Sequence, residues 1–263
     1  MLAKKSLGQH FLISETVVDA ILKACAAEAG RAAAILEIGP GRGALTGGLA
    51  ALGKPFFAVE KDYDLVAQIT DRFSGLHVAL GDARELDLAH IASETKLAPW
   101  LVVGNLPYNA GTDILRRIVS AAGVCSACVV MLQREVAWKF CATAATEGYG
   151  PLSAWTAAWW TGEVLFTVPP GAFQPPPKVT SAVCRFTPRT ERGLMEGESG
   201  RYWTFLRKAF AQPRKTLAGN LASSEGPKCF WEGHLRDLGI PTVARPAQIP
   251  PDVFENLFGQ KPG

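Results

Sequence analysis

A glycine-rich segment and an acidic residue in the first quarter of the chain have the types and spacing of a nucleotide-binding site. Glu37-Ile-Gly39-Pro-Gly41-Arg-Gly43 follows a run of apolar residues and precedes a helical pattern. Glycines at a strand-to-helix turn let the backbone approach a ligand closely, because no Cβ intervenes. Glu60 ends the next apolar run, and a carboxylate there can accept hydrogen bonds from both ribose hydroxyls of an adenosine. These residues predict a site for an adenosine-containing ligand.

A second carboxylate, Asp82, comes just after the third apolar run and precedes Ala83. This position suits a hydrogen bond to the exocyclic amine of a bound adenine. Ligands of open α/β sheets bind at the carboxyl ends of the strands, so three such strand ends predict one shared crevice. The glycine spacing is compatible with NAD and with S-adenosylmethionine alike, and it does not choose between them.

The segment Asn105-Leu106-Pro107-Tyr108, after a fourth apolar run, favours methyl transfer to an amino nitrogen over hydride transfer. The exocyclic nitrogen of adenine is a poor nucleophile, because its lone pair is delocalised into the ring. The Asn105 side-chain oxygen and a backbone carbonyl can accept its two N–H groups and localise that lone pair. Pro107 stiffens the turn, and Tyr108 offers a ring on which an extruded base can stack.

The elements that must position these residues alternate between strand and helix patterns. Strands are predicted at 34–38, 55–59, 76–80, 100–104 and 128–132, and amphipathic helices near 44–52, 62–73, 86–93 and 112–122. A helix over 14–28, with Ser14 as its N-cap, comes first. This alternation predicts an α/β fold, with a parallel sheet covered by helices on both faces.

The pattern changes after residue 133. A helix (133–143) and a tryptophan-rich run (152–160) precede two strands, 164–168 and 181–187, which we expect to form an antiparallel pair at the edge of the sheet. Residues 188–200 have the composition of a linker. Four short helices follow, at 201–211, 214–222, 230–238 and 251–258. We therefore expect an α/β domain over residues 1–188 and a small helical domain over 189–263.

The composition is that of a globular protein, and its small excess of positive charge lies in the C-terminal part. Residues 1–188 carry 16 basic and 16 acidic side chains, whereas residues 189–263 carry 11 and 8. Five of these basic residues lie at 201–215 without an acidic one, which favours an RNA-facing surface. The six cysteines have no metal-like spacing and predict buried thiols. The N-terminus lacks a signal-peptide pattern, so we expect a soluble cytoplasmic protein.

Several of these motifs together resemble the ribosomal RNA adenine dimethyltransferases, most closely the small-subunit type (KsgA). The resemblance rests on the glycine-rich segment, on Asn105–Tyr108 and on Lys5-Ser-Leu-Gly8-Gln9-His10-Phe11-Leu12. It also includes the proline-rich stretch from Val168 to Val179 and Arg214-Lys215-Thr-Leu. It implies a class I S-adenosylmethionine-dependent methyltransferase, with a Rossmann-like sheet and a small C-terminal helical domain for rRNA.

The resemblance also implies a role for each matching residue. Gln9, His10 and Leu12 would lie over the methyl donor, Gly39 and Gly41 against its methionine part, Glu60 and Lys61 at its ribose, and Asp82 with Ala83 at its adenine. Asn105, Leu106, Pro107 and Tyr108 would hold the target base, with Phe173 on its other face. Arg207, Arg214 and Lys215 would bind rRNA. The family usually has Asn where this chain has His10, and a basic residue where it has Pro213.

The implied reaction is an SN2 transfer of methyl groups to the N6 amines of two adjacent adenosines near the 3′ end of small-subunit rRNA, achieved by positioning and without a metal. We expect a monomer that also takes part in small-subunit biogenesis. One alternative is a macrolide-resistance methyltransferase acting on large-subunit rRNA. An NAD(P)-dependent oxidoreductase and a non-catalytic RNA-binding assembly factor are the alternatives from other classes.

Overall fold

The computed structural model describes residues 8–191, 193–195, 197–222 and 225–260. Its chain divides into two compact units, one comprising residues up to 137 together with 162–188, the other residues 138–161 and everything from 189 onward. One boundary of this division falls at 188, and residues 138–161 group with the C-terminal helices. The sequence motif Lys5-Ser-Leu lies outside the described residues.

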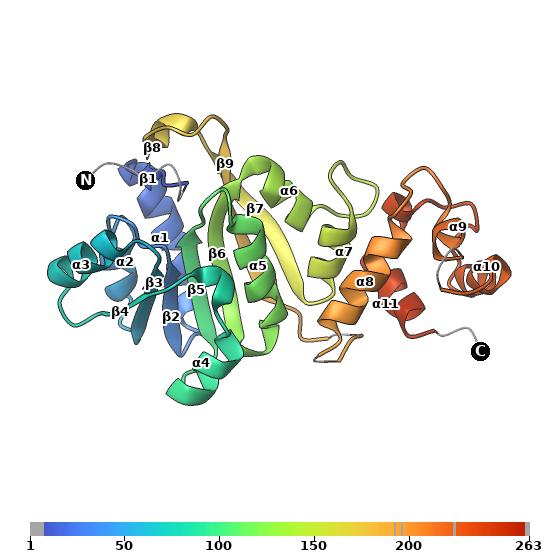
Figure 1. Cartoon of the computed structure of the whole chain (residues 1–263), viewed down its shortest axis with the longest axis horizontal. Coiled ribbons are helices and arrows are strands. Elements are labelled where there is room, and N and C mark those ends of the chain that lie inside the picture. The colour runs from blue at the N-terminus through green and yellow to red at the C-terminus, as the bar shows by residue number, and fades with distance from the viewer. Residues whose placement is uncertain (1–7, 192, 196, 223–224, 261–263) are drawn as a thin grey trace. The chain divides into compact units, whose positions relative to one another are not determined.

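The first unit is built on a seven-stranded sheet with the order β4-β3-β2-β5-β6-β9-β7 (Figure 1). The strands are β2 (Ala34–Ile38), β3 (Phe56–Glu60), β4 (His77–Leu80), β5 (Trp100–Asn105), β6 (Cys125–Gln133), β7 (Trp160–Val168) and β9 (Ser181–Pro188). The first five are parallel, and β9 runs antiparallel to β6. Because β3 and β5 lie on opposite sides of β2, the chain changes direction across the sheet there, which is where such folds bind ligands.

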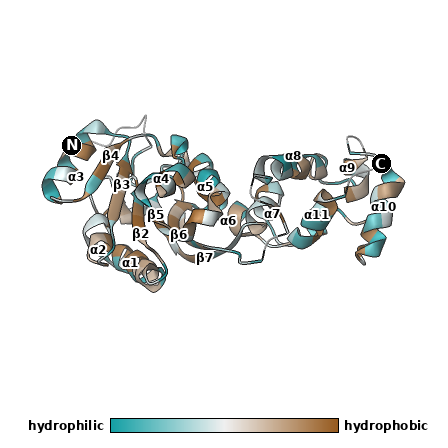
Figure 2. Cartoon of the chain, turned by 90° about the horizontal axis from the view of Figure 1, so that it is seen from below, coloured by the Kyte–Doolittle hydropathy of each residue, from teal (hydrophilic) through white to brown (hydrophobic). Residues whose placement is uncertain are grey.

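Helices cover both faces of this sheet. They are α1 (Glu15–Ala29), α2 (Thr46–Ala50), α3 (Tyr63–Arg72), α4 (Leu88–Thr95), α5 (Gly111–Ser120) and α6 (Arg134–Cys141), with short 3₁₀ turns at Ala83–Glu85, Ala122–Val124 and Pro170–Ala172. Figures 1 and 2 show α1 and α2 on one face and α4 and α5 on the other. At the centre of the sheet, β2 is buried throughout and β5 is buried from Trp100 to Gly104, and both strands are mostly hydrophobic, as expected when both faces are covered. The predicted class I methyltransferase fold is confirmed.

All the predicted strands are found, and two of them begin several residues earlier than predicted. β6 begins at Cys125 rather than at 128, and β7 begins at Trp160 rather than at 164. The last two strands are neighbours at one edge of the sheet, as expected. A second, two-stranded sheet was not predicted: β1 (Phe11–Leu12) pairs antiparallel with β8 (Phe173–Gln174). Ser14 occupies the N-cap position of α1, but its side chain makes no capping hydrogen bond within the described chain.

The second unit is helical. It contains α7 (Pro151–Ala157), α8 (Ser199–Ala209), α9 (Leu217–Leu221), α10 (Lys228–Asp237) and α11 (Pro251–Phe258), with a 3₁₀ turn at Pro246–Gln248. Two hydrogen bonds explain why 138–161 belongs here: the Tyr149 hydroxyl donates to the Ile249 carbonyl at 2.8 Å, and the Trp155 indole to that of Ser199 at 3.2 Å. No helix in the described ranges has the length and apolar character needed to cross a membrane.

Candidate active site

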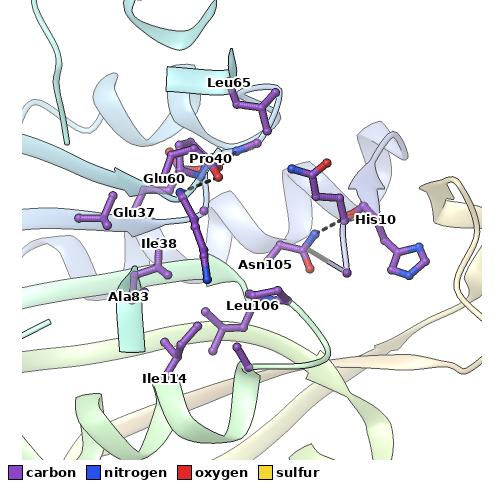
Figure 3. Close-up of a pocket in the computed structure, with 18 of the residues that line it drawn as sticks. His10, Glu37, Ile38, Pro40, Glu60, Leu65, Ala83, Asn105, Leu106 and Ile114 are labelled. Carbon is purple, nitrogen blue, oxygen red and sulfur yellow. Dashed lines mark hydrogen bonds between the residues drawn. The ribbon is translucent and has the colours of Figure 1, made fainter. Parts of the chain in front are cut away.

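A pocket lies in the first unit at the carboxyl ends of β2, β3, β4 and β5 (Figure 3). It is lined by five segments that are far apart in sequence, which are the chain around 8–12, 37–45, 59–65, 81–84 and 105–110, together with Ile114. Thirteen predicted site residues line it: Gln9, His10, Leu12, Gly39, Gly41, Glu60, Lys61, Asp82, Ala83, Asn105, Leu106, Pro107 and Tyr108.

The glycine-rich turn after β2 forms one wall of the pocket. Gly39 and Gly41 have φ values of +65° and +58°, a conformation that L side chains rarely adopt. A Cβ on Gly41 would lie 3.3 Å from the ring of Phe11, so a side chain there would crowd the wall. The turn therefore presents bare backbone to a ligand.

Glu60 is held by the main chain at the end of β3. Its carboxylate accepts hydrogen bonds from the backbone N–H groups of Gly41, Lys61 and Asp62, at 3.1, 2.8 and 2.9 Å. Burial raises the pKa of this carboxyl, and the three hydrogen bonds oppose that shift. A carboxylate has about four acceptor positions, so the fixed Glu60 retains one for a ligand hydroxyl.

Asp82 forms ion pairs with two cationic side chains. Arg84 donates through Nε and a terminal nitrogen, the latter at 2.6 Å, and the Lys61 ammonium lies 2.8 Å from Oδ2. These contacts hold the pKa of Asp82 well below its usual range, so it stays an acceptor. Lys61, predicted at the ribose, thus directs its ammonium to Asp82, while its backbone N–H fixes Glu60.

The Asn105 carboxamide is oriented by the N-terminal segment. Its Nδ2 donates to the main-chain carbonyl of His10 at 3.0 Å, which leaves Oδ1 as the available acceptor (Figure 3). The turn that follows is closed by hydrogen bonds from the N–H groups of Ala110 and Gly111 to the Pro107 carbonyl. The Tyr108 hydroxyl hydrogen-bonds Ser181 at the start of β9.

Gln9 and His10 direct their side chains to protein partners. Gln9 donates to Asp62 at 2.9 Å, and the His10 ring contacts the Pro175 carbonyl at 2.8 Å and the Tyr108 ring at a centroid distance of 5.1 Å. Figure 3 shows the imidazole pointing away from Glu60. His10 lines the pocket, and its place over the methyl donor stays a prediction.

Phe173 lies outside the pocket, although the resemblance to the family places it at the target base. Its side chain is only 2% exposed, belongs to the hydrophobic core with Leu12 and Val168, and does not line the pocket. The reason is the pairing of β8 with β1, which places Phe173 opposite Leu12. Phe173 is therefore not among the residues that line the pocket in this structure, and its place on the other face of the target base stays a prediction.

Glu37 lines the pocket and was quoted only as part of the glycine motif. It is 2% exposed, accepts a hydrogen bond from Thr46 at 2.7 Å, and burial raises its pKa to about 7. An acidic residue inside an otherwise apolar strand was the signal that could have singled it out, because buried carboxylates are rare. Among the described residues no group of His, Cys, Asp or Glu is arranged to hold a metal.

The residues present fit S-adenosylmethionine. Bare backbone at Gly39 and Gly41, one acceptor position at Glu60 and an ionised Asp82 supply the surfaces that an amino acid tail, a ribose and an adenine need. Arg207, Arg214 and Lys215 lie in the second unit, so the structure does not group them with this pocket.

Comparison with known proteins decides the family. The model of the ribosomal RNA adenine dimethylase family matches residues 1–244. A ribosomal RNA small subunit methyltransferase A from Xylella fastidiosa is 36% identical over 98% of this chain and 96% of its own length. The chain belongs to the ribosomal RNA adenine dimethylase family. This dimethylase is accordingly an enzyme with S-adenosylmethionine as its cofactor.

Other relatives agree in name and in fold. Proteins named ribosomal RNA small subunit methyltransferase A from Xanthomonas campestris and Acidobacterium capsulatum are 37% and 35% identical, over 94% and 97% of this dimethylase and 92% and 90% of their own lengths. A dimethyladenosine transferase from Plasmodium falciparum superposes with a TM-score of 0.78 at 22% identity, over 94% of this chain and 96% of that one. The 23S rRNA methyltransferase ErmE gives 0.72 at 24% identity, over 94% and 98%. These two structures establish the fold alone.

Proposed function

We propose that this dimethylase transfers methyl groups to the N6 amines of two adjacent adenosines near the 3′ end of small-subunit rRNA. The relatives of 35–37% identity carry the name ribosomal RNA small subunit methyltransferase A, and their lengths match this chain almost completely. The 23S rRNA methyltransferase ErmE shares the fold at only 24% identity. The small-subunit substrate is therefore favoured over the large-subunit alternative.

The observation that carries the chemistry is the fixed orientation of Asn105. Its Nδ2 is engaged by the His10 carbonyl at 3.0 Å, so Oδ1 is directed to accept an N–H from an adenine amine. Accepting that hydrogen bond helps to localise the lone pair of the amine for attack. The bound cofactor supplies an electrophilic methyl group on its sulfonium. Tyr108, anchored through its hydroxyl to Ser181, provides a ring against which the base stacks.

We assign the cofactor to the pocket residues of the first unit. Gly39 and Gly41 would receive the amino acid part, Glu60 the ribose, and Asp82 with Ala83 the adenine. Catalysis in this scheme comes from positioning the two reactants and excluding water. The alkylated amine becomes acidic and loses its proton afterwards, so no strong general base is needed.

We assign rRNA binding to the second unit. Residues 211–215 are all exposed, and this stretch carries Arg214 and Lys215 and contains no acidic residue; Arg207 is exposed on α8. Cations presented in this way suit a phosphate backbone. In this proposal the enzyme acts as a cytoplasmic monomer on the small subunit or its precursor, and contributes to small-subunit biogenesis.

The test offers both kinds of ribosomal subunit, each lacking its adenine methylation, with isotopically labelled S-adenosylmethionine. We expect label in small-subunit rRNA only, and none with Asn105→Ala. Label in large-subunit rRNA alone would instead support the macrolide-resistance type. Absence of transfer to either, with cofactor binding intact, would leave the non-catalytic assembly factor.

A further inference from the structure

His10 makes contacts with both ends of the Asn105–Tyr108 motif. Its main-chain carbonyl accepts the Asn105 Nδ2, and its imidazole lies 5.1 Å from the Tyr108 ring centroid with 30° between the ring planes. The imidazole is itself fixed by the contact of Nδ1 with the Pro175 carbonyl at 2.8 Å. One residue therefore links the N-terminal segment, the motif and the proline-rich loop.

Tyr108 is restrained at two points by these contacts. Ser181, which is fully buried at the start of β9, holds its hydroxyl, and the His10 imidazole packs against its ring. A hydroxyl contact alone leaves the ring free to rotate about the axis through that oxygen. A second contact on the ring removes this freedom, and aromatic rings at such a distance attract one another.

We propose that the His10 imidazole is a positioning residue for Tyr108, which sets the plane of the ring that receives the target adenine. This inference rests on the proposed function, and it concerns a side chain that differs from the Asn usual in the family. It separates the two parts of His10: the backbone carbonyl serves Asn105 in any variant, whereas the side chain serves Tyr108.

A double-mutant cycle tests the proposal. We expect His10→Ala to lower kcat/KM for rRNA about 3- to 10-fold, and His10→Phe, which retains a ring, to restore most of it. In a Tyr108→Ala background, the His10→Ala substitution should have no further effect, because its partner is gone. Equal effects in both backgrounds would overturn the proposal. Binding of S-adenosylhomocysteine by His10→Ala should match that of the wild type.

His77 provides a matched control. It also stacks on an aromatic ring, that of Phe57, at 5.2 Å and 17°, but it lies in β4 and does not line the pocket. His77→Ala removes a contact of the same kind and should leave kcat/KM unchanged. A loss equal to that of His10→Ala would show that a general effect on the fold is responsible, and would contradict the proposal.

A measurement without catalysis separates this inference from the proposed function. The chain has four histidines, so the ring signals of His10 can be assigned by NMR from the spectrum of His10→Phe. Tyr108→Leu should shift the His10 signals and leave those of His77 in place. Unshifted His10 signals would overturn the inference, whatever the enzyme methylates. A wild type that methylates neither subunit would overturn the proposed function, while the NMR result still decides the contact.

Discussion

At the scale of single residues, the pocket depends on side chains whose hydrogen-bonding capacity is mostly used by the protein itself. Asn105 gives its donor to His10, Glu60 accepts from three backbone N–H groups, and Asp82 accepts from the side chains of Arg84 and Lys61. Each group therefore has a fixed orientation before any ligand is considered. Such preorganisation reduces the reorganisation needed when charge is redistributed in a reaction.

Asn105→Asp tests the orientation of the carboxamide. Aspartate retains an acceptor but cannot donate to the His10 carbonyl, and it places two oxygens against each other at the 3.0 Å contact. We expect single-turnover methyl transfer at saturating cofactor to fall about 10²-fold or more, as when other preorganised polar groups are removed. An Asn105→Asp enzyme with wild-type rate would show that the amide donor is irrelevant.

Glu37 predicts a pH dependence of stability. Burial raises its pKa to about 7 from 4.5, so between these values the folded state binds more protons than the unfolded state. Stability from this group is therefore present at pH 4.5 and is lost as the pH rises through 7, by up to about 3 kcal/mol. Glu37→Gln cannot ionise and retains an acceptor for Thr46.

Urea unfolding at pH 5 and pH 8 provides the measurement for Glu37. The stability advantage of Glu37→Gln over the wild type should grow between the two pH values, because only the wild type loses this contribution. Glu94→Gln, the same change on an exposed part of α4, should track the wild type. A constant difference between Glu37→Gln and wild type would contradict the assignment.

At the scale of elements, the alternation of apolar runs with amphipathic segments was enough to predict the parallel sheet, because buried strands leave continuous apolar sequence. The core environment of Phe173 was not predicted, because it depends on the pairing of β8 with β1 across more than 150 residues of chain. The same limit applies to Tyr149 and to Trp155 of α7, whose hydrogen-bond partners Ile249 and Ser199 follow much later in the chain. Local sequence carries no record of such distant contacts.

The close approach of β5 to β2 gives a prediction at this scale. A Cβ on Gly104 would lie 2.7 Å from the main-chain oxygen of Ile38, the residue before the Gly39 turn. Gly104→Ala must move one of these strands, and we expect a loss of about 1–3 kcal/mol in unfolding free energy, with weaker cofactor binding. Gly171→Ala, where a Cβ meets nothing within 4 Å, should leave both unchanged. Equal free energies of unfolding for Gly104→Ala and Gly171→Ala would disprove this account of the strand contact.

At the scale of the whole molecule, our proposal assigns a different role to each unit. The first unit binds the cofactor and contains the Asn105–Tyr108 motif, and the second unit carries the exposed cations. The net charge of +3 is small, so RNA binding must come from local clusters. Each phosphate contact contributes a term of about 0.7–0.9 to the slope of log affinity against log salt.

Arg214→Ala/Lys215→Ala should therefore reduce that slope by about 1.5, without altering cofactor affinity. Removing two cations from α10 of the same unit, with Lys228→Ala/Arg236→Ala, provides the control for charge alone. Filter binding to small-subunit rRNA at several salt concentrations measures both variants. Equal slopes for the two variants would contradict a specific role for residues 214 and 215.

The most direct test of the central claim is to identify the modified nucleosides and their positions. Small subunits lacking the modification are incubated with the enzyme and S-adenosylmethionine, the rRNA is digested, and its 3′-terminal fragment is analysed by mass spectrometry. We predict N6,N6-dimethyladenosine at two adjacent positions of that fragment, and none with Asn105→Ala. Methylation of any other atom or of a site outside that fragment, or an unmodified fragment in the presence of bound cofactor, would contradict the account.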